Sequence, residues 1–325
     1  MNILLWLVFL TAFAGYTLTG RTFNLGYRAM RRLYGASDGR FNDLCLKIAQ
    51  VLRPPSPVSW SSSGFLGEWR ATDIERTVAE LDRDGIAILS RSLPDSACSA
   101  LEAFARATPA LPMGRQTKEL YDAQRASALR YDFDEADILR CADACRICFD
   151  GTFSSIAAAY FRCRPIYDFA AMWWTTPSGP KDYSAAAQKF HFDMDRLFFL
   201  KFFIYLTDVT PDTGPHVFVA GSHRRKPPPF RQDRRFDDDE VAAHYPAPAI
   251  RTVCGPRGTI FAADTRALHK GEPVVRGERL VLQAEFAISK FGQNYGNVDV
   301  SWSRLQAYGF TQMPDLRVFR NIRVG

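Results

Sequence analysis

Histidine is scarce in this chain, and the first 190 of its 325 residues contain none. The five histidines, at positions 191, 216, 223, 244 and 269, all lie in the second part of the chain. Imidazole is the commonest protein metal ligand and a frequent general base. A catalytic or metal-binding site built on histidine is therefore excluded from the first 190 residues.

Cysteine is also sparse, and its pattern excludes a disulfide scaffold. The chain has seven cysteines, an odd number without dense spacing, which fits reduced thiols in the cytoplasm. Cys141, Cys145 and Cys148 have the spacing used by radical enzymes that bind a four-iron, four-sulfur cluster. The same spacing places three sulfurs on one stripe of a helix, where small apolar residues pack. We expect packing, with an iron–sulfur radical enzyme as the alternative.

A nucleic-acid-binding module is absent despite the basic composition. The net charge is +6 and the pI is about 9.0, but the arginines are scattered and no basic-aromatic platform is present. We therefore expect no nucleic-acid partner. The hydrophobic content of 47% is sufficient for one large domain with additions.

Charge is missing from residues 3–19, which are apolar apart from threonines, and Arg21 and Arg28 follow. This pattern predicts that residues 1–20 associate with a membrane as an anchor, with the catalytic domain on the cytoplasmic side. About 17 residues is at the short end for a membrane span. A signal peptide, suggested by Ala12-Phe13-Ala14, and a helix packed on the domain or on another subunit are the alternatives.

Hydrophobic periodicity divides the rest of the chain into helices followed by strands. Residues 21–70 are expected to form a basic helical region and a linker rich in proline at 53–57. Further helices are predicted at 72–83, where Thr72 or Asp73 would be the cap, at 95–106 and over most of 134–161. Strands are predicted at 86–89, 197–206, 217–219, 259–262 and 279–288. Residues 224–248 are predicted to be a solvated loop, with a lid as the alternative.

Two histidines and one aspartate have the spacing of a metal site. His191 and Asp193 form an H-x-D motif, and residues i and i+2 of an extended strand point to the same side. His269 would come from a strand adjacent in space. Two histidines and a carboxylate form the facial triad of non-haem Fe(II) oxygenases, which leaves three metal positions open.

The surroundings of this motif resemble a known family. The chain contains, in order, Leu81-Asp-Arg-Asp-Gly-Ile-Ala-Ile-Leu89, Gln188-Lys-Phe-His-Phe-Asp-Met-Asp195, Asp208-Val-Thr-Pro-Asp-Thr-Gly-Pro215, Ala220-Gly-Ser-His223, His269 and Arg279. Over roughly residues 75–290 this order resembles the phytanoyl-CoA dioxygenase-like family of Fe(II)- and 2-oxoglutarate-dependent oxygenases. One departure is Thr213, where the family often has asparagine.

This resemblance implies a fold and a set of site residues. The fold would be mainly β with flanking helices, namely a double-stranded β-helix (a jelly roll, cupin-like) over residues 71–290, with an N-terminal helical segment and a C-terminal extension at 291–325. His191, Asp193 and His269 would bind iron, and Arg279 would bind the distal carboxylate of 2-oxoglutarate. In this family 2-oxoglutarate takes two of the open metal positions, and O2 takes the third.

Other polar residues near the motif are weaker candidates. Lys201 lies in an otherwise apolar strand and requires a partner. Asp195, Asp208, 2-oxoglutarate and an acidic substrate group are the options. Gln188 and Tyr205 are expected to line the co-substrate pocket. Of the remaining histidines, His216 is a candidate for the pocket, His223 is expected to stabilise a turn and His244 to be exposed.

The expected activity is hydroxylation of a C–H bond in a small-molecule or lipid-like substrate, with release of succinate and CO2. Asp193 argues against the related halogenases, which have a small residue at this position. A cupin-like metal-binding protein or isomerase that does not turn over 2-oxoglutarate is the first alternative, and a membrane-associated scaffold without chemistry is another. Neither the substrate nor the oligomeric state follows from the sequence.

Overall fold

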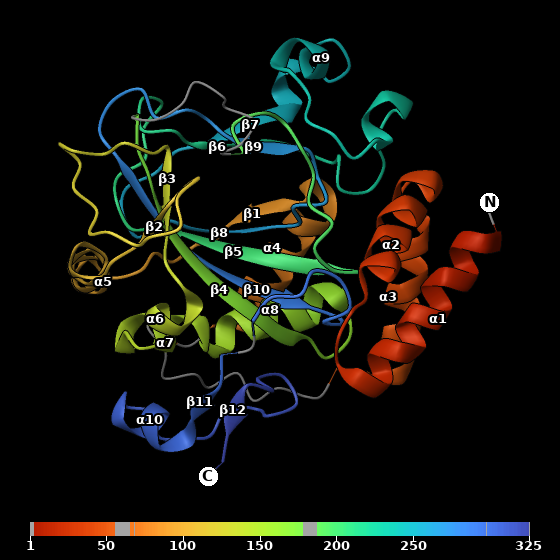
Figure 1. Ribbon diagram of the computed structural model, residues 1–325, viewed down its shortest axis with the longest axis horizontal. Coiled ribbons are helices and arrows are strands. Elements are labelled where there is room, and N and C mark those ends of the chain that lie inside the picture. The colour runs from red at the N-terminus through yellow and green to blue at the C-terminus, as the bar shows by residue number, and fades with distance from the viewer. Residues whose placement is uncertain (1–2, 56–65, 68, 178–186, 297, 325) are drawn as a thin grey trace.

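Two antiparallel sheets face each other in the computed structural model of the chain, which describes residues 3–55, 66–67, 69–177, 187–296 and 298–324 (Figure 1). The larger sheet has the order β1-β8-β5-β10-β4-β3-β2, and the smaller has the order β7-β6-β9. The strands of the two sheets are β1 (Ile86–Ile88), β2 (Leu111–Pro112), β3 (Arg130–Asp132), β4 (Ile166–Thr175), β5 (Phe199–Tyr205), β6 (His216–Val219), β7 (Ile250–Val253), β8 (Ile260–Ala263), β9 (His269–Gly271) and β10 (Arg279–Ala287). The predicted jelly roll with flanking helices is confirmed.

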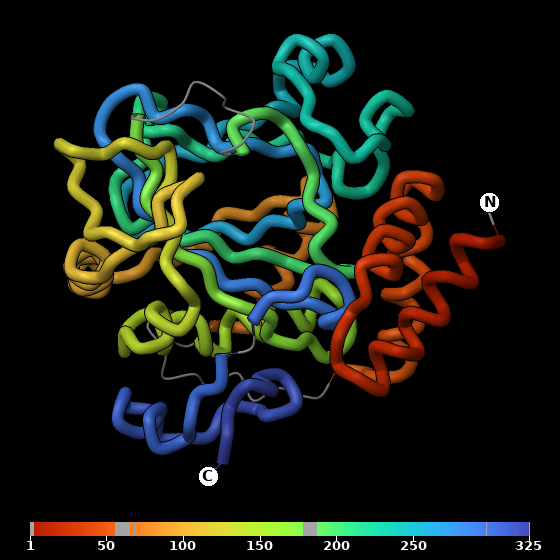
Figure 2. Tube along the Cα trace, in the orientation of Figure 1, coloured from red at the N-terminus to blue at the C-terminus, as the bar shows by residue number. Residues whose placement is uncertain are grey.

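Helices surround the sheets on several sides. They are α1 (Ile3–Thr19), α2 (Asn24–Ser37), α3 (Arg40–Leu52), α4 (Ala71–Asp84), α5 (Asp95–Ala107), α6 (Glu135–Ile138), α7 (Ala142–Cys148), α8 (Gly151–Phe161), α9 (Asp238–Ala242) and α10 (Trp302–Ala307). Helices α4, α6, α7 and α8 lie against the large sheet on the side away from the small sheet, and α1–α3 form a separate layer at one edge (Figures 1 and 2). The predicted helices at 72–83, 95–106 and 134–161 are therefore present.

The central strands of the large sheet have two different faces. Along β5 and β10 alternate side chains point to opposite sides. Leu200, Phe202 and Ile204 belong to the outer core beneath the helices. Phe203 and Tyr205 belong to the inner core between the two sheets. The inner face is therefore the face that can carry a site enclosed by both sheets.

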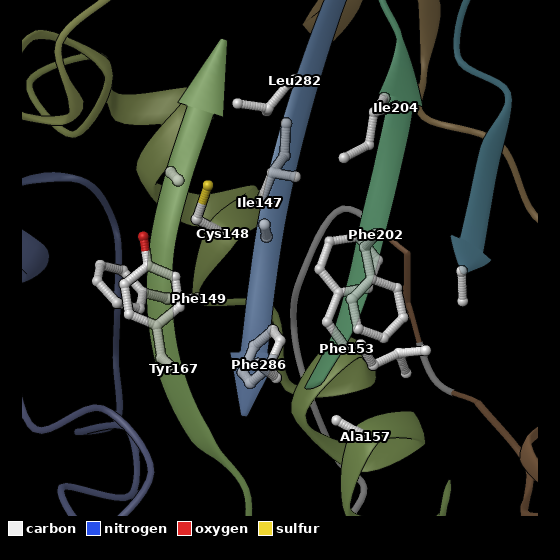
Figure 3. Packing of buried hydrophobic residues seen from close by; sticks show 14 of the residues in the cluster. Ile147, Cys148, Phe149, Phe153, Ala157, Tyr167, Phe202, Ile204, Leu282 and Phe286 are labelled. Carbon is white, nitrogen blue, oxygen red and sulfur yellow. The ribbon is translucent and has the colours of Figure 1, made fainter. Parts of the chain in front are cut away.

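Aromatic stacking fixes the helices on the outer face. Phe153 of α8 stacks on Phe202 of β5 with ring centroids 4.4 Å apart, and Tyr167 of β4 packs edge-on against Phe286 of β10 (Figure 3). Cys148 of α7 lies in the same core beside β4 and β10. Burial of this many aromatic rings supplies much of the hydrophobic stabilisation of the domain.

The three clustered cysteines belong to this packed core. Cys145 and Cys148 are completely buried, and Cys141 precedes the first residue of α7. Burial raises the pKa of the Cys145 thiol to about 12 and that of Cys148 well above its ordinary value. These thiols are thus protonated packing groups rather than thiolate ligands. The structure supports the packing interpretation over the iron–sulfur alternative.

Helix α4 begins one residue earlier than predicted. The residue before it is Arg70, not Thr72 or Asp73, and its backbone NH donates to a carboxylate oxygen of Asp73 at 3.4 Å. Asp73 therefore stabilises the start of the helix from inside its first turn. The helix ends at Gly85, whose φ of 82° favours glycine.

The N-terminal helix packs on the domain through aromatic residues. Phe9 of α1 contacts Phe41 of α3 and Phe291, with ring centroids 4.8 and 5.3 Å apart, and Phe13 also contacts Phe291. Among the described residues, no helix combines the length and apolarity needed to cross a bilayer. One face of α1 is therefore packed on the domain, as the packed-helix alternative predicted. Part of the predicted linker, residues 56–57, lies outside the described residues.

The prediction of a solvated loop at 224–248 is wrong for its central part. Phe230, Phe236 and Val241 are buried and pack in one cluster with Phe190 and Leu268. Phe190 directly precedes His191, and Leu268 directly precedes His269. The backbone NH of Phe236 also donates to the carbonyl of Phe190 at 2.8 Å. Because arginines and aspartates surround these three residues in the sequence, the segment was predicted to be solvated and the small apolar core was missed.

The C-terminal extension completes the outer core. Val300 of β11 (Val300–Ser301), Leu305 of α10 and Ile322 of β12 (Ile322–Arg323) are buried in it. Strands β11 and β12 pair in parallel as a separate two-stranded sheet. Residues 291–325 are thus integrated with the domain by packing, as far as the structure describes them.

Candidate metal centre

Backbone pairing brings the two histidines together. His191 and His269 form a bridge in which the NH of each donates to the carbonyl of the other, at 2.9 and 2.8 Å. The NH of Asp193 donates to the carbonyl of Thr265 at 2.8 Å, which continues the pairing in the same direction. Side chains of residues directly opposite in such a pair lie on the same side. The extended segment at 191–193 and the start of β9 therefore present three side chains to one point.

The three side chains have the geometry of a metal-binding group. Potential ligand atoms of His191, Asp193 and His269 all lie within 4.8 Å of one another. Nε2 of His191 is 3.7 Å from Oδ1 of Asp193, and Nε2 of His269 is 3.5 Å from Oδ2. The structure thus brings together the three residues predicted from the H-x-D motif and the distant histidine.

Both histidines have their metal-binding nitrogen free of protons. Nδ1 of His191 lies 2.9 Å from the carbonyl oxygen of Lys189, and Nδ1 of His269 lies 2.9 Å from that of Ala267. A carbonyl only accepts, so Nδ1 carries the proton and Nε2 carries the lone pair. Burial lowers the pKa of His191 to about 3 and also lowers that of His269. Neutral imidazoles are the form that binds a metal.

Asp193 is ionised in this environment. Burial opposes ionisation, but the charge and the hydrogen bond of the Lys201 ammonium outweigh it and hold the pKa of Asp193 below its ordinary value. Lys201 donates to Asp193 Oδ2 at 2.8 Å and to Asp195 Oδ2 at 2.9 Å. Of the partners considered for Lys201, Asp195 is confirmed. Asp208 is not its partner, because it accepts instead from the backbone NH of Arg257.

Arg279 is buried on the same inner face and has unused hydrogen-bond donors. Its Nη2 donates weakly to Thr175 Oγ1 at 3.3 Å, while buried Nε and Nη1 make no hydrogen bond within the described structure. Burial lowers the pKa of Arg279 to about 10. A guanidinium with unused donors is suited to a carboxylate, and its fork geometry allows two hydrogen bonds once one of these donors is joined by Nη2.

Tyr205 lies opposite Val281, two residues from Arg279, on the inner face. Its hydroxyl donates to the carbonyl of Val253 at 2.9 Å and accepts from the backbone NH of His216 at 3.2 Å. Burial raises the pKa of Tyr205 to about 12, so the hydroxyl keeps its proton. Tyr205 is therefore a neutral group that also fixes the position of His216.

The other polar candidates take different positions. Gln188 is buried, and neither its amide oxygen nor its nitrogen has a hydrogen-bond partner among the described residues. His216 is buried on the inner face, against the rings of Phe203 and Phe261. His223 is buried behind Gly85, whereas His244 is exposed as expected.

Two further residues near Arg279 were not predicted, because no motif or periodic pattern in the sequence singles them out. Thr175 lies opposite Arg279 in the pairing of β4 with β10, and Arg130 lies opposite Thr175 in the pairing of β3 with β4. The Arg130 guanidinium stacks on the ring of Trp173 at 4.3 Å. Strand register alone places them beside Arg279, and register was not predictable from isolated motifs.

Several solved structures are similar to this chain. AviO1 from Streptomyces viridochromogenes Tue57 has 19% identity and a TM-score of 0.45, over 67% of this chain and 96% of that one. The non-haem α-ketoglutarate-dependent epimerase SnoN from nogalamycin biosynthesis has 18% identity and a TM-score of 0.48, over 67% and 82%. EctD from S. alaskensis with bound Fe has 18% identity and a TM-score of 0.46, over 72% and 83%. None of the curated proteins matches the chain.

A family model gives the assignment directly. The model of phytanoyl-CoA dioxygenase matches residues 81–277, which is more than half of the chain and contains all three residues of the metal-binding group. Fe(II) and 2-oxoglutarate, expected from the resemblance, are the cofactor and co-substrate of this family of oxygenases. The chain belongs to the phytanoyl-CoA dioxygenase (PhyH) family.

Proposed function

We propose that this protein is a mononuclear Fe(II)- and 2-oxoglutarate-dependent dioxygenase that hydroxylates a C–H bond of a small-molecule or lipid-like substrate. The observation that carries the proposal is the proximity of two features, since the Arg279 guanidinium lies against Gly271 of β9, the strand that begins with His269. A facial group of two neutral histidines and an ionised aspartate lies beside the inner face of the large sheet, and a buried arginine with unused donors lies on that face. A metal-binding protein without 2-oxoglutarate has no need for this arginine.

Each residue has a distinct role in this proposal. His191, Asp193 and His269 hold Fe(II), and Arg279 holds the distal carboxylate of 2-oxoglutarate, with Thr175 orienting the guanidinium. When bound, Fe(II) and 2-oxoglutarate supply the electrons that activate O2. Tyr205 supports the co-substrate side of the pocket, and Gln188 offers an amide to a ligand. Phe203 and Val281 make the enclosure apolar and exclude water.

Anaerobic titration of the protein with Fe(II) and 2-oxoglutarate tests this proposal. We expect the weak visible charge-transfer band of the chelate, its loss in His269→Ala and its weakening in Arg279→Ala. The exposed His244 provides a matched control, and His244→Ala is expected to keep the band. Tight metal binding that is indifferent to 2-oxoglutarate would instead assign the protein to the cupin-like alternative.

The type of oxidation is tested separately by isotope labelling. Hydroxylation inserts one atom of O2 into the product and the other into succinate, so turnover under labelled O2 is expected to give a product heavier by one labelled oxygen. A product with no added oxygen would exclude hydroxylation while leaving the Fe(II) and 2-oxoglutarate chemistry in place. Succinate release without an added substrate gives a first measure of turnover.

A membrane surface is the proposed working location, because exposed large hydrophobic residues are concentrated in the N-terminal helices. Among the described residues, seventeen large hydrophobic residues have exposed side chains, and eleven of them lie between residues 3 and 52. They are Ile3, Leu4, Leu7, Leu10, Leu18, Phe23, Leu25, Leu44, Ile48, Val51 and Leu52. We name this set the N-terminal apolar face. Exposed apolar groups at this density are typical of protein or membrane contacts.

Charge favours an anionic lipid surface as the partner of the N-terminal apolar face. The first 37 residues contain four arginines and no acidic residue. Arg21, Arg28 and Arg32 are exposed. Because Phe9 and Phe13 already fix the opposite side of α1 to the domain, the helix would lie in the plane of the membrane surface. The cytoplasmic leaflet carries the anionic lipids that would attract these arginines.

Vesicle flotation tests this location. The full chain is expected to float with vesicles containing phosphatidylglycerol, and less so with pure phosphatidylcholine vesicles. The double variant Leu7→Glu/Leu10→Glu is expected to lose flotation, whereas Val275→Glu, at an exposed hydrophobic residue outside the N-terminal apolar face, keeps it. Absence of flotation by the natural chain excludes the lipid surface. A dimer that dissociates in the double variant would assign this face to a second copy.

A further inference from the structure

Lys201 is buried beside the metal centre and contacts one of its three ligands. Its ammonium donates to Oδ2 of Asp193 and of Asp195, at 2.8 and 2.9 Å, and Oε2 of Glu285 is 3.6 Å away. Only 6% of the Lys201 surface is exposed, and Glu285 is completely buried. A buried ammonium requires compensating charge and hydrogen bonds. Here a ligand of the proposed metal supplies part of both.

The position of Lys201 is set independently of Asp193. Lys201 lies on β5 between two neighbouring strands, opposite Glu285 of β10 and Ala263 of β8. Asp195 accepts a hydrogen bond from its ammonium, and Glu285 lies 3.6 Å away without a hydrogen bond. Asp193, by contrast, lies outside the named strands, in the segment that follows His191. A side chain fixed on a central strand thus restrains a side chain on a less regular segment.

We propose that Lys201 is a positioning residue that makes Asp193 a ligand through one oxygen only. Both carboxylate oxygens face a histidine, since Oδ2 lies 3.5 Å from Nε2 of His269 and Oδ1 lies 3.7 Å from Nε2 of His191. The hydrogen bond from the ammonium occupies Oδ2 and leaves Oδ1 as the oxygen offered to the metal. A carboxylate that bound through both oxygens would occupy one of the three positions that a facial triad leaves open. Because the co-substrates need those positions, Lys201 preserves the capacity to bind 2-oxoglutarate. This inference rests on the function proposed above.

Lys201 also keeps the centre assembled before a metal arrives. Asp193 and Asp195 both lie within hydrogen-bond distance of one ammonium, so their carboxylates are close to each other. Without a cation, like charges in a buried site repel strongly. Lys201 therefore supplies the compensating charge for these carboxylates in the metal-free protein. Removal of Lys201 should make the fold more dependent on bound metal.

The chain contains a matched control lysine. Lys270 is buried to a similar extent, and its ammonium contacts Asp238 at 2.7 Å and Glu272 at 2.8 Å. It follows His269 on β9, but adjacent strand residues point to opposite sides, so it does not contact Asp193. Replacement of Lys270 removes a similarly buried ammonium, whose carboxylate partners are more exposed than those of Lys201, without touching the metal ligands.

The test compares Lys201→Met and Lys270→Met by two binding measurements. The first is the shift in Tm on saturation with Mn(II), and the second is the affinity of the Mn(II)-loaded protein for 2-oxoglutarate. In Lys201→Met we expect a larger Tm shift than in the natural chain. We also expect a loss of 2-oxoglutarate affinity of about 10- to 100-fold, by analogy with the loss of metal affinity or activity when a partner of a metal ligand is removed. Lys270→Met is expected to match the natural chain in both.

The outcomes separate this inference from the proposed function. A natural chain that binds no Mn(II) contradicts the proposed function itself. A natural chain that binds Mn(II) and 2-oxoglutarate, with both measurements unchanged in Lys201→Met, overturns only the role of Lys201. If Lys201→Met does not fold with or without metal, Lys201→Gln replaces it. That variant keeps a donor but no charge, so the larger Tm shift is expected with a smaller loss of 2-oxoglutarate affinity. Unchanged values in Lys201→Gln would likewise overturn the role.

Discussion

His191 and His269 are hydrogen-bonded to each other through both of their backbone NH groups, at 2.9 and 2.8 Å. This bridge places two imidazoles on one side of a strand pair, with ring centroids 4.3 Å apart. The ring nitrogens that face away from Asp193 donate to backbone carbonyls of Lys189 and Ala267. Backbone pairing therefore decides both where the two ligands lie and which nitrogen of each is available.

Substitution of Arg279 is expected to separate co-substrate binding from metal binding. Arg279→Lys keeps a positive charge but loses the planar fork of guanidinium donors, so the affinity for 2-oxoglutarate should fall by about 10- to 100-fold, or about 1.4–2.8 kcal/mol. The metal-induced Tm shift should remain. Equilibrium binding of 2-oxoglutarate to the Mn(II)-loaded protein measures the effect.

Arg276→Lys is the control for Arg279→Lys, because Arg276 is exposed and pairs with Asp212 away from the inner face. This variant should bind 2-oxoglutarate as the natural chain does. Equal affinity in Arg279→Lys and Arg276→Lys would contradict the assignment of Arg279.

Truncation of Phe236 is expected to destabilise the protein, although this residue lies in a segment rich in charge. Phe236 is completely buried, and its ring lies 4.9 Å from that of Phe230. Phe236→Ala should reduce the free energy of unfolding by about 3–5 kcal/mol, the usual cost of removing a buried aromatic side chain. Urea unfolding measures this loss. Asp239→Ala, at an exposed position nearby, should stay within about 0.5 kcal/mol of the natural chain.

Acidification should weaken the fold partly through His223. Burial lowers the pKa of His223 to about 4, from an unfolded value of about 6.5. Between these values the unfolded chain binds a proton that the folded chain does not, so stability decreases as the pH falls from about 6.5 towards 4. The contribution of this one group between pH 7 and pH 5 is about 2 kcal/mol.

Urea unfolding of His223→Gln at pH 7 and pH 5 measures this contribution. The difference in stability between the two pH values should be smaller in this variant by about 2 kcal/mol. The exposed His244 is the control, and His244→Gln should show the same pH dependence as the natural chain. An unchanged pH dependence in His223→Gln would exclude His223 as the titrating group.

Thiol labelling should report the packing of the cysteines. Cys254 is exposed, whereas Cys98, Cys145, Cys148 and Cys163 are buried. In the native protein a thiol reagent should therefore modify Cys254 first, and Cys254→Ser should remove this fast phase. Cys145 and Cys148 should react only on unfolding. Rapid native labelling of Cys145, or a brown chromophore lost in Cys145→Ser, would restore the iron–sulfur alternative.

Local patterns were sufficient to predict many of the elements. The apolar run at 197–206 became β5, and the segment at 279–288 became β10, because period-two alternation with buried aromatics suits a strand inside a sheet. The H-x-D motif and the order of the surrounding segments indicated the metal-binding residues, since i and i+2 share a side in an extended chain. Composition could not divide residues 3–19 between Phe9 and Phe13, which pack against Phe291, and Leu7 and Leu10, which are exposed.

Tertiary structure decided the partners of these residues. Lys201 had several acidic groups within reach along the sequence, and strand register placed it opposite Glu285, with Asp193 and Asp195 at its ammonium. Thr175 reaches Arg279 only because β4 pairs with β10. Composition and periodicity determine which residues are buried and in what kind of element. Which buried charges meet depends on the pairing of distant strands, and that is a property of the whole fold.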